Sequence, residues 1–511
     1  MPEGAEQLLV PPQSEWEEVL KDNLRLQIAS SFNFGFKVAE FRQRVLDAAR
    51  LFSSSLLRTG KERGLSGDVF EKHQHLVEQS CLKGCSPLVV TGHQPLIYHC
   101  GLMAKNQALN WLSHNKGALG LNIIMDTSEG DGGEIYYPQV SRERMAVAGL
   151  SIADDRTLFL GQRLVSQAQL AGAFNLVEEN LEKVGCNDAL QGTKKAAAFY
   201  LNLAALRVVT ANSLVRLGFE GERFYLELPF SELCALEESQ IFFARLLADG
   251  PRLWEVYNRT LCEERQAHRI KNPANPFPDL LRLGNRLEMP FWFIDLAQGK
   301  RLPLWLEKEK GAWLLWCAEK QVGDLYSGAA RVVPKGLVVP RGGLIAFFLR
   351  LLCSDLFVHG LGGAHYDTFS DSFSLRYLGI RLPRFVIASA NRYLFGKELQ
   401  VYEQNLKVKN SLWHIYSHTA EYLGRGLFPE ALEAGLFKLV LTRRQLVDEL
   451  IQLAGSKEQK RAVLLQLNGL NKQVKLLVKQ SALYQKAMAP SVSAETLQVW
   501  RFREFPFWFF P

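Results

Sequence analysis

A short segment near residue 90 combines the residue types that bind phosphate groups and act on them. An apolar run that ends at Thr91 is followed by glycine, histidine and glutamine, and then by a helical pattern whose first turns carry lysine and asparagine. The candidate residues of this segment are Thr91, Gly92, His93, Gln94, His99, Gly101, Lys105 and Asn106. A strand that turns into a helix presents backbone N–H groups and the positive helix end to an anion. We predict that His93 and Lys105 are catalytic and stabilise phosphate charge, whereas the others bind the substrate or nucleotide.

A second segment, near residue 360, places glycines and ionisable side chains after another apolar run. The candidate residues are His359, Gly360, Gly362, Gly363, His365, Tyr366, Asp367 and Asp371. Glycines let the backbone approach a ligand closely, and imidazole and carboxylate groups supply acid–base chemistry. This segment is not a Walker A loop, since the Lys-Ser/Thr pair is missing. We predict catalytic roles for His365 and Asp367 and binding roles for the others. Packing turns without a ligand are the alternative at both segments.

Two further residues are expected at the same site. Arg341 ends an apolar run, and an arginine at the end of a strand suits an anion clamp. Asp126 follows another such run and opens an acidic segment that ends at Glu134, which fits either Mg²⁺ beside a nucleotide or a solvated loop. We predict ATP or another nucleotide as cofactor and leave a Mg²⁺ requirement open. We expect no resident metal, because the histidine spacings do not match a known metal helix.

The apolar runs predict an α/β fold with a Rossmann-like parallel sheet at its core. Residues 88–91 and 121–125 read as strands that flank a helix over 102–115, which makes one β-α-β unit. Further core strands are expected at 336–341, 356–360 and 384–389. Uninterrupted apolar runs suit parallel strands that are covered on both faces. Ligands of such sheets lie beyond the carboxyl ends of the strands, where both candidate segments fall.

The domain organisation follows from where this pattern starts and stops. We predict a helical lead-in at 1–85, the first half of the core at 86–149, an inserted, mostly helical connective region at 150–329, the second half of the core at 330–395, and a C-terminal helical region with an aromatic tail at 396–511. Apolar residues from Val463 onward recur at steps of four and three, which predicts a helical hairpin or coiled coil. An intramolecular hairpin and a homodimer arm both fit this pattern. The aromatic tail is expected to pack on a groove or on a partner.

Composition and charge narrow the class of partner. Sixty basic and 53 acidic residues give a net charge of +7. Without a long Lys/Arg run, this balance indicates a small-molecule substrate rather than nucleic acid. The eight cysteines are scattered, as is typical of reduced thiols, and neither a signal peptide nor a membrane-spanning apolar stretch is apparent. We therefore expect a cytoplasmic protein that does not associate with a membrane.

Two of the motifs resemble a known family. Val-Val-Thr-Gly-His-Gln-Pro at 89–95, with Lys105 behind it, resembles the Thr-Gly-Gln-Gln turn of the bacillithiol-synthesis cysteine-adding enzymes, the BshC family. Pro340-Arg341 and the Gly-Gly-Ala-His-Tyr run at 362–366 are similar to that family's Arg-Pro and Gly-Gly-Pro-x-Glu-x-x-Tyr region. More similar still is an uncharacterised BshC-like bacterial family with the patterns T-G-H-Q-P and H-G-x-G-G-A-x-Y-D.

The resemblance implies a Rossmann-like core with connective insertions, a dimerising coiled-coil arm, and a nucleotide-linked ligase that joins an amino acid to an amino-sugar conjugate. His93 stands where the family has glutamine and His365 where it has an acidic residue, so the substrate does not carry over. The first hypothesis is therefore a BshC-like enzyme with ligase-like or nucleotidyl-transfer-like chemistry. The second is a non-catalytic nucleotide- or sugar-binding protein that recruits a partner through its helical arm. A metal-dependent hydrolase is the third.

Overall fold

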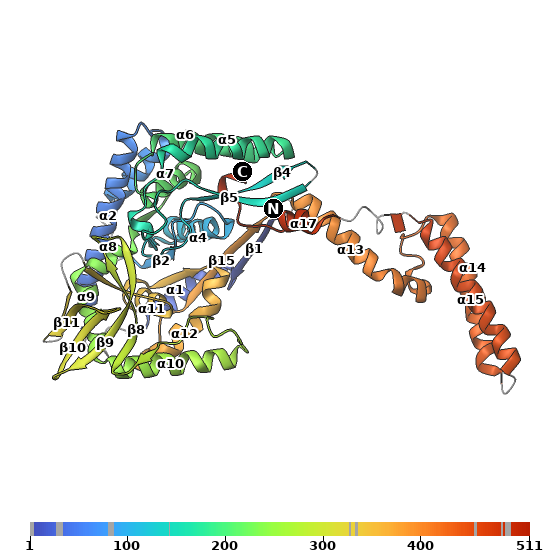
Figure 1. Cartoon of the computed structure of the whole chain (residues 1–511). Coiled ribbons are helices and arrows are strands. Elements are labelled where there is room, and N and C mark those ends of the chain that lie inside the picture. Colours follow the sequence, from blue (N-terminus) through green and yellow to red (C-terminus); the bar gives the residue numbers. More distant parts are fainter. Residues whose placement is uncertain are drawn as a thin grey trace. The chain divides into compact units, whose positions relative to one another are not determined.

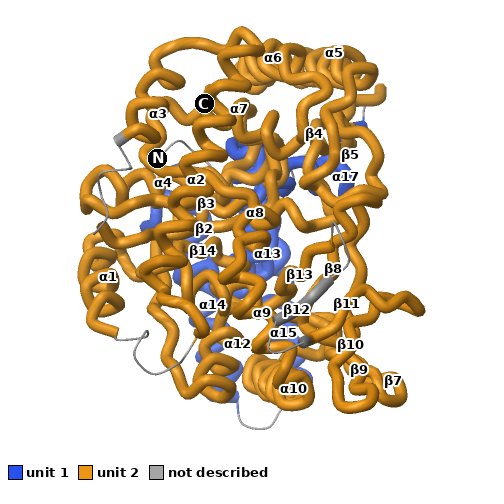
Figure 2. Tube along the Cα trace, turned by 90° about the vertical axis from the view of Figure 1, so that its left-hand side faces the viewer, with its two compact units in different colours: residues 1–4, 144–146, 395–502 blue, residues 5–143, 147–394, 503–511 orange. Residues whose placement is uncertain are grey.

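The chain divides into two compact units (Figure 2). The computed structural model describes residues 5–26, 34–79, 86–142, 144–326, 329–332, 336–453, 457–481, 484–485 and 492–510. Unit 1 is built mainly from Phe395–Phe502, and unit 2 from Ala5–Glu143, Val147–Leu394 and Arg503–Pro511. Both predicted halves of the core therefore belong to unit 2.

The main sheet of unit 2 has six strands in the order β1-β15-β14-β2-β3-β6, of which β1, β15 and β2 are labelled in Figure 1. They are β1 (Ala5–Val10), β2 (Leu88–His93), β3 (Leu119–Ile124), β6 (Tyr225–Pro229), β14 (Leu356–His359) and β15 (Phe385–Arg392). All neighbours pair in parallel except β1, which runs antiparallel to β15 at the edge. The predicted parallel core of an α/β fold is thus confirmed. β1 lies within the expected helical lead-in, so the prediction for that segment is wrong at residues 5–10.

Helices cover both faces of this sheet, which is why its strands are apolar on both sides. The helices of unit 2 are α1 (Trp16–Leu24), α2 (Val38–Glu62), α3 (Asp68–Gln79), α4 (Cys100–Lys116), α5 (Gln167–Val184), α6 (Asn187–Asn202), α7 (Val208–Glu220), α8 (Phe230–Ala235), α9 (Glu237–Ala248), α10 (Gly250–Ala267), α11 (Gly343–Phe348) and α12 (Leu361–Leu378). Val89 packs with Leu109 of α4 and Trp16 of α1 in one apolar cluster. Its neighbour Val90 packs in another cluster with Phe369 of α12. Successive residues of β2 therefore serve opposite faces.

A second sheet of unit 2 is antiparallel and has the order β12-β11-β10-β9-β8-β13. Its strands are β7 (Arg282–Leu283), which pairs with β8, then β8 (Arg286–Asp295), β9 (Lys300–Glu309), β10 (Ala312–Cys317), β11 (Lys320–Tyr326), β12 (Ala329–Val332) and β13 (Gly336–Pro340). β13 pairs with β8, so the prediction that 336–341 joins the parallel core is wrong. Conversely, β6 lies inside the expected insertion yet pairs with β3 in the core. An apolar run therefore predicts that a strand is buried, but it does not predict which strand pairs with it.

The remaining elements are a two-stranded ribbon and the helices of unit 1. β4 (Glu134–Ser141) pairs with β5 (Arg144–Ser151), and unit 1 contains α13 (Gly396–Ser417), α14 (Glu430–Gln452), α15 (Lys457–Lys479) and α17 (Ala494–Trp500). Leu436 of α14 and Val474 and Val478 of α15 are buried in one apolar cluster, so the predicted pairing of these two helices is confirmed. Among the described residues, no helix is both long enough and apolar enough to cross a membrane.

Candidate functional site

The carboxyl ends of β2 and β14 lie side by side, and the helices that follow them leave on opposite faces of the sheet. Thr91 pairs with Val358, and its hydroxyl donates to the Val358 carbonyl at 2.8 Å. α4 follows β2 and packs in the cluster of Val89, whereas α12 follows β14 and packs in the cluster of Val90. In open parallel sheets a reversal of this kind opens a crevice where ligands bind.

Lys105 joins these two strand ends. Its ammonium donates to the Gly92 carbonyl at 2.9 Å, and a Cβ placed on Gly360 would lie 3.7 Å from its side chain. The side chain is buried, with 5% exposure. Burial, and to a lesser degree the charge of Arg216, lowers the pKa of Lys105 to about 7. The amine therefore exchanges a proton near neutral pH, which suits general acid–base chemistry.

His359, at the end of β14, is held by a carboxylate. Its Nε2 lies 2.7 Å from Asp367 Oδ2, and its ring contacts Phe357 and Phe385. A Cβ on Gly363 would come within 2.9 Å of Nδ1, so glycine is required beside the ring. Burial lowers the pKa of His359, although Asp367 opposes this effect. A neutral imidazole that donates from Nε2 leaves Nδ1 as a proton acceptor, which is the arrangement of a general base.

Asp367 is kept ionised by Arg350. Arg350 donates to Asp367 at 2.7 Å and to Asp371 at 2.8 Å, and it lies in a π-helical turn over Leu349–Cys353. Burial raises the pKa of Asp367, but the hydrogen bond from His359 and the charge of Arg350 outweigh it and hold the pKa at about 2. Sequence reasoning missed Arg350, which reads only as a charge that interrupts an apolar helix. We call Gly92, Lys105, His359, Gly360 and Asp367 the strand-end site.

The glycine-containing segment that follows β14 is the start of a helix. Gly360 is the N-cap of α12, and no side chain caps this end. Leu361, Gly362 and Gly363 are exposed, and a Cβ on Gly362 would meet nothing within 4 Å. The polar residues of this segment lie on successive turns of α12. The N–H groups of this first turn, which the helix cannot satisfy itself, are still presented to solvent.

The turn after β2 is built mainly by local hydrogen bonds. His99 has a φ of 73° and caps α4, where its Nδ1 accepts from the Gly101 N–H at 2.9 Å. His93 Nδ1 lies 3.3 Å from the Gln94 carbonyl. Burial and the charge of Lys105 lower the pKa of His93 well below its ordinary value. His99 and Gly101 thus shape the turn, whereas His93 borders the cavity beside Lys105.

That cavity is small and polar. It measures about 10 Å³, roughly the space of one water molecule, and its walls include His93, Lys105, Asn106, Asn122 and Arg216. Asn106 donates to Glu220 at 3.1 Å. Arg216 belongs to a buried group of two arginines and two glutamates with Glu220, Arg223 and Glu227, which sequence reasoning missed. Their spacing of four, three and four residues with opposite charges was the available signal.

The C-terminal tail holds the same turn in place. The His99 N–H donates to the Phe505 carbonyl at 3.2 Å, and the Phe507 N–H donates to the Ile97 carbonyl at 3.0 Å. Trp508 packs on α6, where a Cβ on Gly192 would come within 1.8 Å of its carbonyl oxygen. Of the two expectations for the tail, a groove of the same chain is confirmed for residues 505–510.

Three predicted site residues make their contacts elsewhere. Arg341 follows β13 and pairs with Glu288 at 2.6 Å, so its expected place at the edge of the parallel sheet is wrong. His365 lies on α12 and is exposed, and its ring faces those of His268 and Tyr366. Asp126 accepts from the Ser231 backbone at 2.8 Å, and burial raises its pKa to about 6. The described contacts of Asp126 therefore hold the first turn of α8.

The acidic segment behind β3 does not gather into one group. Glu129 lies 3.4 Å from Arg301, Asp131 accepts from the Tyr136 hydroxyl at 2.7 Å, and Glu134 accepts from two glycine N–H groups. Within the described ranges, no three His, Cys, Asp or Glu side chains are placed to hold a metal ion. The carboxylates of this segment order the loop around β4.

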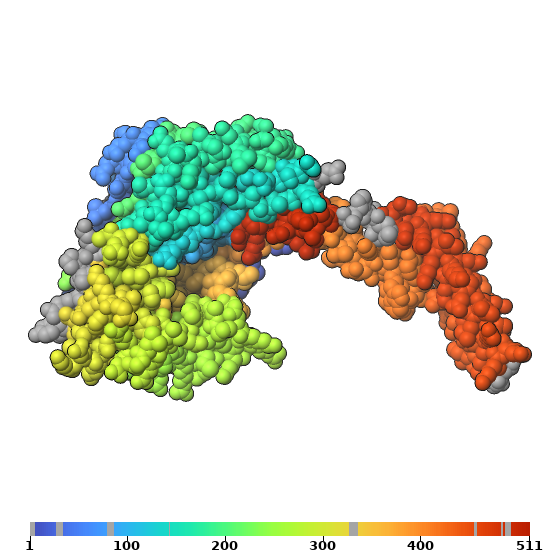
Figure 3. Space-filling model, in the orientation of Figure 1, coloured from blue at the N-terminus to red at the C-terminus, as the bar shows by residue number. Residues whose placement is uncertain are grey.

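Unit 2 is hollowed on one face (Figure 3). The hollow lies between the segment coloured teal and the segment coloured yellow-green, and α12 in light orange lies at its back.

Comparisons with known proteins add no family to this geometry. No protein-family model matches the chain, and a search of curated proteins finds no match. The function must therefore be argued from the site.

Proposed function

We propose that unit 2 is a Rossmann-like enzyme core that binds a nucleotide or phosphorylated substrate at the strand-end site. The observation that carries the proposal is the His359–Asp367 pair, 2.7 Å apart, beside a buried Lys105 at the ends of two adjacent parallel strands. Buried acid–base groups with shifted pKa values that share a specific charge partner are frequent marks of an active site. The order β6-β3-β2-β14-β15 supports the Rossmann-like assignment, since numbered along the chain it is the 3-2-1-4-5 order of doubly wound folds.

The phosphate of the ligand is assigned to the first turn of α12. Its free N–H groups and the positive helix end favour an anion, and Gly362 leaves the approach open. Lys105, whose side chain lies against Gly360, would supply a positive charge on the opposite side of the phosphate. ATP, when bound, would supply the phosphate whose departure drives condensation.

The chemistry proposed is ligase-like condensation. The amine would form a C–N bond to a substrate carboxyl carbon activated by phosphate, and the C–O bond to that phosphate would break. His359 Nδ1 would accept the proton of the amine while Asp367 holds the ring, and Lys105 would stabilise charge on the leaving phosphate. The BshC-like motifs suggest an amino acid and an amino-sugar conjugate as substrates. His93, His365 and Tyr366 would then contribute to substrate choice, because they differ from that family's pattern or border the exposed turn. The described cysteines are all free thiols, which supports a cytoplasmic location.

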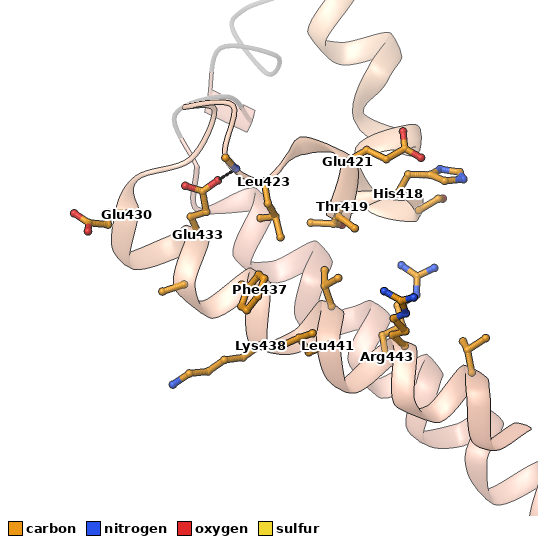
Figure 4. A pocket seen from close by; sticks show the side chains of 17 residues that line it. His418, Thr419, Glu421, Leu423, Glu430, Glu433, Phe437, Lys438, Leu441 and Arg443 are labelled. Atoms are coloured by element: carbon orange, nitrogen blue, oxygen red, sulfur yellow. Dashed lines mark hydrogen bonds between the residues drawn. The ribbon is translucent and has the colours of Figure 1, made fainter.

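The helical arm supports a second candidate, a nucleotide- or sugar-binding protein that recruits a partner. Unit 1 has a groove of about 1040 Å³ between α14 and the segment after α13 (Figure 4). Phe437 and Leu441 line it, and Phe437 is 53% exposed. Exposed apolar side chains of this kind mark contact surfaces. In this reading α14 and α15 form a coiled-coil arm that binds a partner, a second copy of the chain included.

Substitution of His359 separates the two candidates. The full-length protein would be assayed for ATP binding and for amine-dependent phosphate release, with His359→Asn and, as a control in an exposed position, His75→Asn. An enzyme loses turnover but retains nucleotide binding in His359→Asn. Binding without turnover in the unmodified protein, with affinity alone altered by the substitution, would favour the partner-recruiting protein instead.

A further inference from the structure

A second pocket of unit 2 lies at the start of β15, where it includes Phe385, whose ring also contacts His359. It measures about 480 Å³, which is within the range of small-molecule sites. Its lining includes Arg350, Asp371, Leu375, Arg381, Arg384 and Phe385. We propose that this arginine pocket binds a small organic phosphate, separately from any ligand of the strand-end site.

The charge of the arginine pocket favours an anion. Its lining has three arginines and the carboxylate of Asp371, and the buried Asp367 also pairs with Arg350, which leaves a surplus of one positive charge. Arg381 is exposed and forms no hydrogen bond or ion pair with the residues that the structure describes. Arg384 is only loosely engaged, since its Nη1 lies 3.7 Å from Asp22 on the exposed surface. A phosphomonoester near neutral pH carries nearly two negative charges.

Arg350 is the fixed part of this pocket. Its side chain is 1% exposed and is held by Asp367 and by the Pro383 carbonyl. Its Nη2 reaches Asp371, whose side chain is 45% exposed and so can yield its place to a phosphate oxygen. A guanidinium that is already oriented loses little conformational entropy when it binds an oxyanion.

Apolar side chains distinguish an organic phosphate from a free phosphate ion. Leu375 and Phe385 line the pocket beside the arginines. The Phe385 ring lies 5.0 Å from the Arg350 guanidinium. A ligand with a short apolar portion would bury it against these two side chains and gain affinity that inorganic phosphate lacks.

Calorimetric titration of the full-length protein with phenyl phosphate tests the proposal. We expect binding that Arg381→Glu weakens by tenfold or more. Arg282→Glu, which makes the same change of charge at an exposed position of β7, should leave it unaltered. Lys105→Met should also leave it unaltered, because Lys105 belongs to the strand-end site. Inorganic phosphate and benzoate should bind at least tenfold more weakly than phenyl phosphate.

Each opposite result overturns a defined part of the proposal. No binding of phenyl phosphate, or equal loss in Arg381→Glu and Arg282→Glu, means that this pocket is not the site. Loss in Lys105→Met alone moves the phosphate to the strand-end site, which refutes the inference but supports the proposed function. If benzoate binds as tightly as phenyl phosphate, the pocket does not select a doubly charged phosphate. If inorganic phosphate binds as tightly as phenyl phosphate, the apolar portion of the ligand contributes no affinity.

Discussion

Replacing Lys105 by methionine removes a titratable group whose pKa differs between the folded and unfolded chain. The folded value is about 7, against 10.5 in the unfolded chain. Between these values the unfolded chain holds the proton and the folded chain does not, so the free energy of unfolding rises with pH. The wild type should therefore gain stability between pH 7 and pH 9 relative to Lys105→Met.

The size of this gain follows from the pKa difference. One pKa unit corresponds to about 1.4 kcal/mol, and the folded lysine is already half deprotonated at pH 7, which leaves roughly 2 kcal/mol between pH 7 and pH 9. The hydrogen bond from Lys105 to Gly92 is lost in the variant as well. Loss of this hydrogen bond shifts the free energy of unfolding by the same amount at every pH and leaves its slope with pH nearly unchanged. A difference in slope between the two proteins therefore reports the titration of Lys105.

Urea unfolding at several pH values measures the slope. A pulse of hydrogen–deuterium exchange, read by mass spectrometry on peptides of β2, assigns the transition to unit 2 rather than unit 1. Lys194→Met, at an exposed position of α6, is the matched control for the loss of one lysine. If the curves of the wild type and Lys105→Met stay parallel from pH 7 to pH 9, Lys105 keeps its ordinary pKa and our account of the strand-end site is wrong.

Three further predictions concern the surroundings of the strand-end site. Gly192→Ala should displace the C-terminal tail, because the new Cβ would strike the Trp508 carbonyl oxygen, and peptides of 505–510 should then exchange hydrogen faster. The control Gly172→Ala places its Cβ in open space on α5 and should instead stabilise that helix by up to about 1 kcal/mol. Asp367→Asn should flatten the loss of stability on acidification. Because the pKa of Asp367 is lowered in the folded chain, its carboxylate stabilises the fold at pH values above the pKa of the unfolded chain, and this stabilisation is lost as the pH falls toward 2. Acid titrations that match the wild type would contradict this prediction. Glu227→Gln should destabilise unit 2 by about 3 kcal/mol or more, because it leaves two buried arginines with one carboxylate; a loss below about 1 kcal/mol in urea would show that the buried group is not coupled.

Local sequence patterns predicted much of unit 2 correctly. The strands at 88–91 and 121–125 and the helix between them appear at the expected places as β2, β3 and α4. The apolar steps from Val463 predicted that α15 packs against α14. These features depend on residues close together in the chain, where periodicity and turn chemistry leave little choice.

The candidate site was predicted in part. His93, Lys105, His359 and Asp367 were singled out from their types and positions, but with different roles. His365 was assigned catalysis and His359 only binding, since the sequence does not show which histidine faces a carboxylate. On α12 the residue eight positions after His359 is Asp367, and only the turn from β14 into that helix brings the two within 2.7 Å.

The sequence by itself therefore determined the elements and the chemical types near their ends, because both are local properties of the chain. Tertiary structure decided which ends meet. β13 has an apolar run like those of the core strands, yet it pairs with β8, and so Arg341 neutralises Glu288 instead of facing the strand-end site. Arg350 reaches Asp367 and Asp371 from a different helix. Pairing partners are selected by packing between segments far apart in sequence, and this packing also sets the burial that shifts the pKa values of Lys105 and His359.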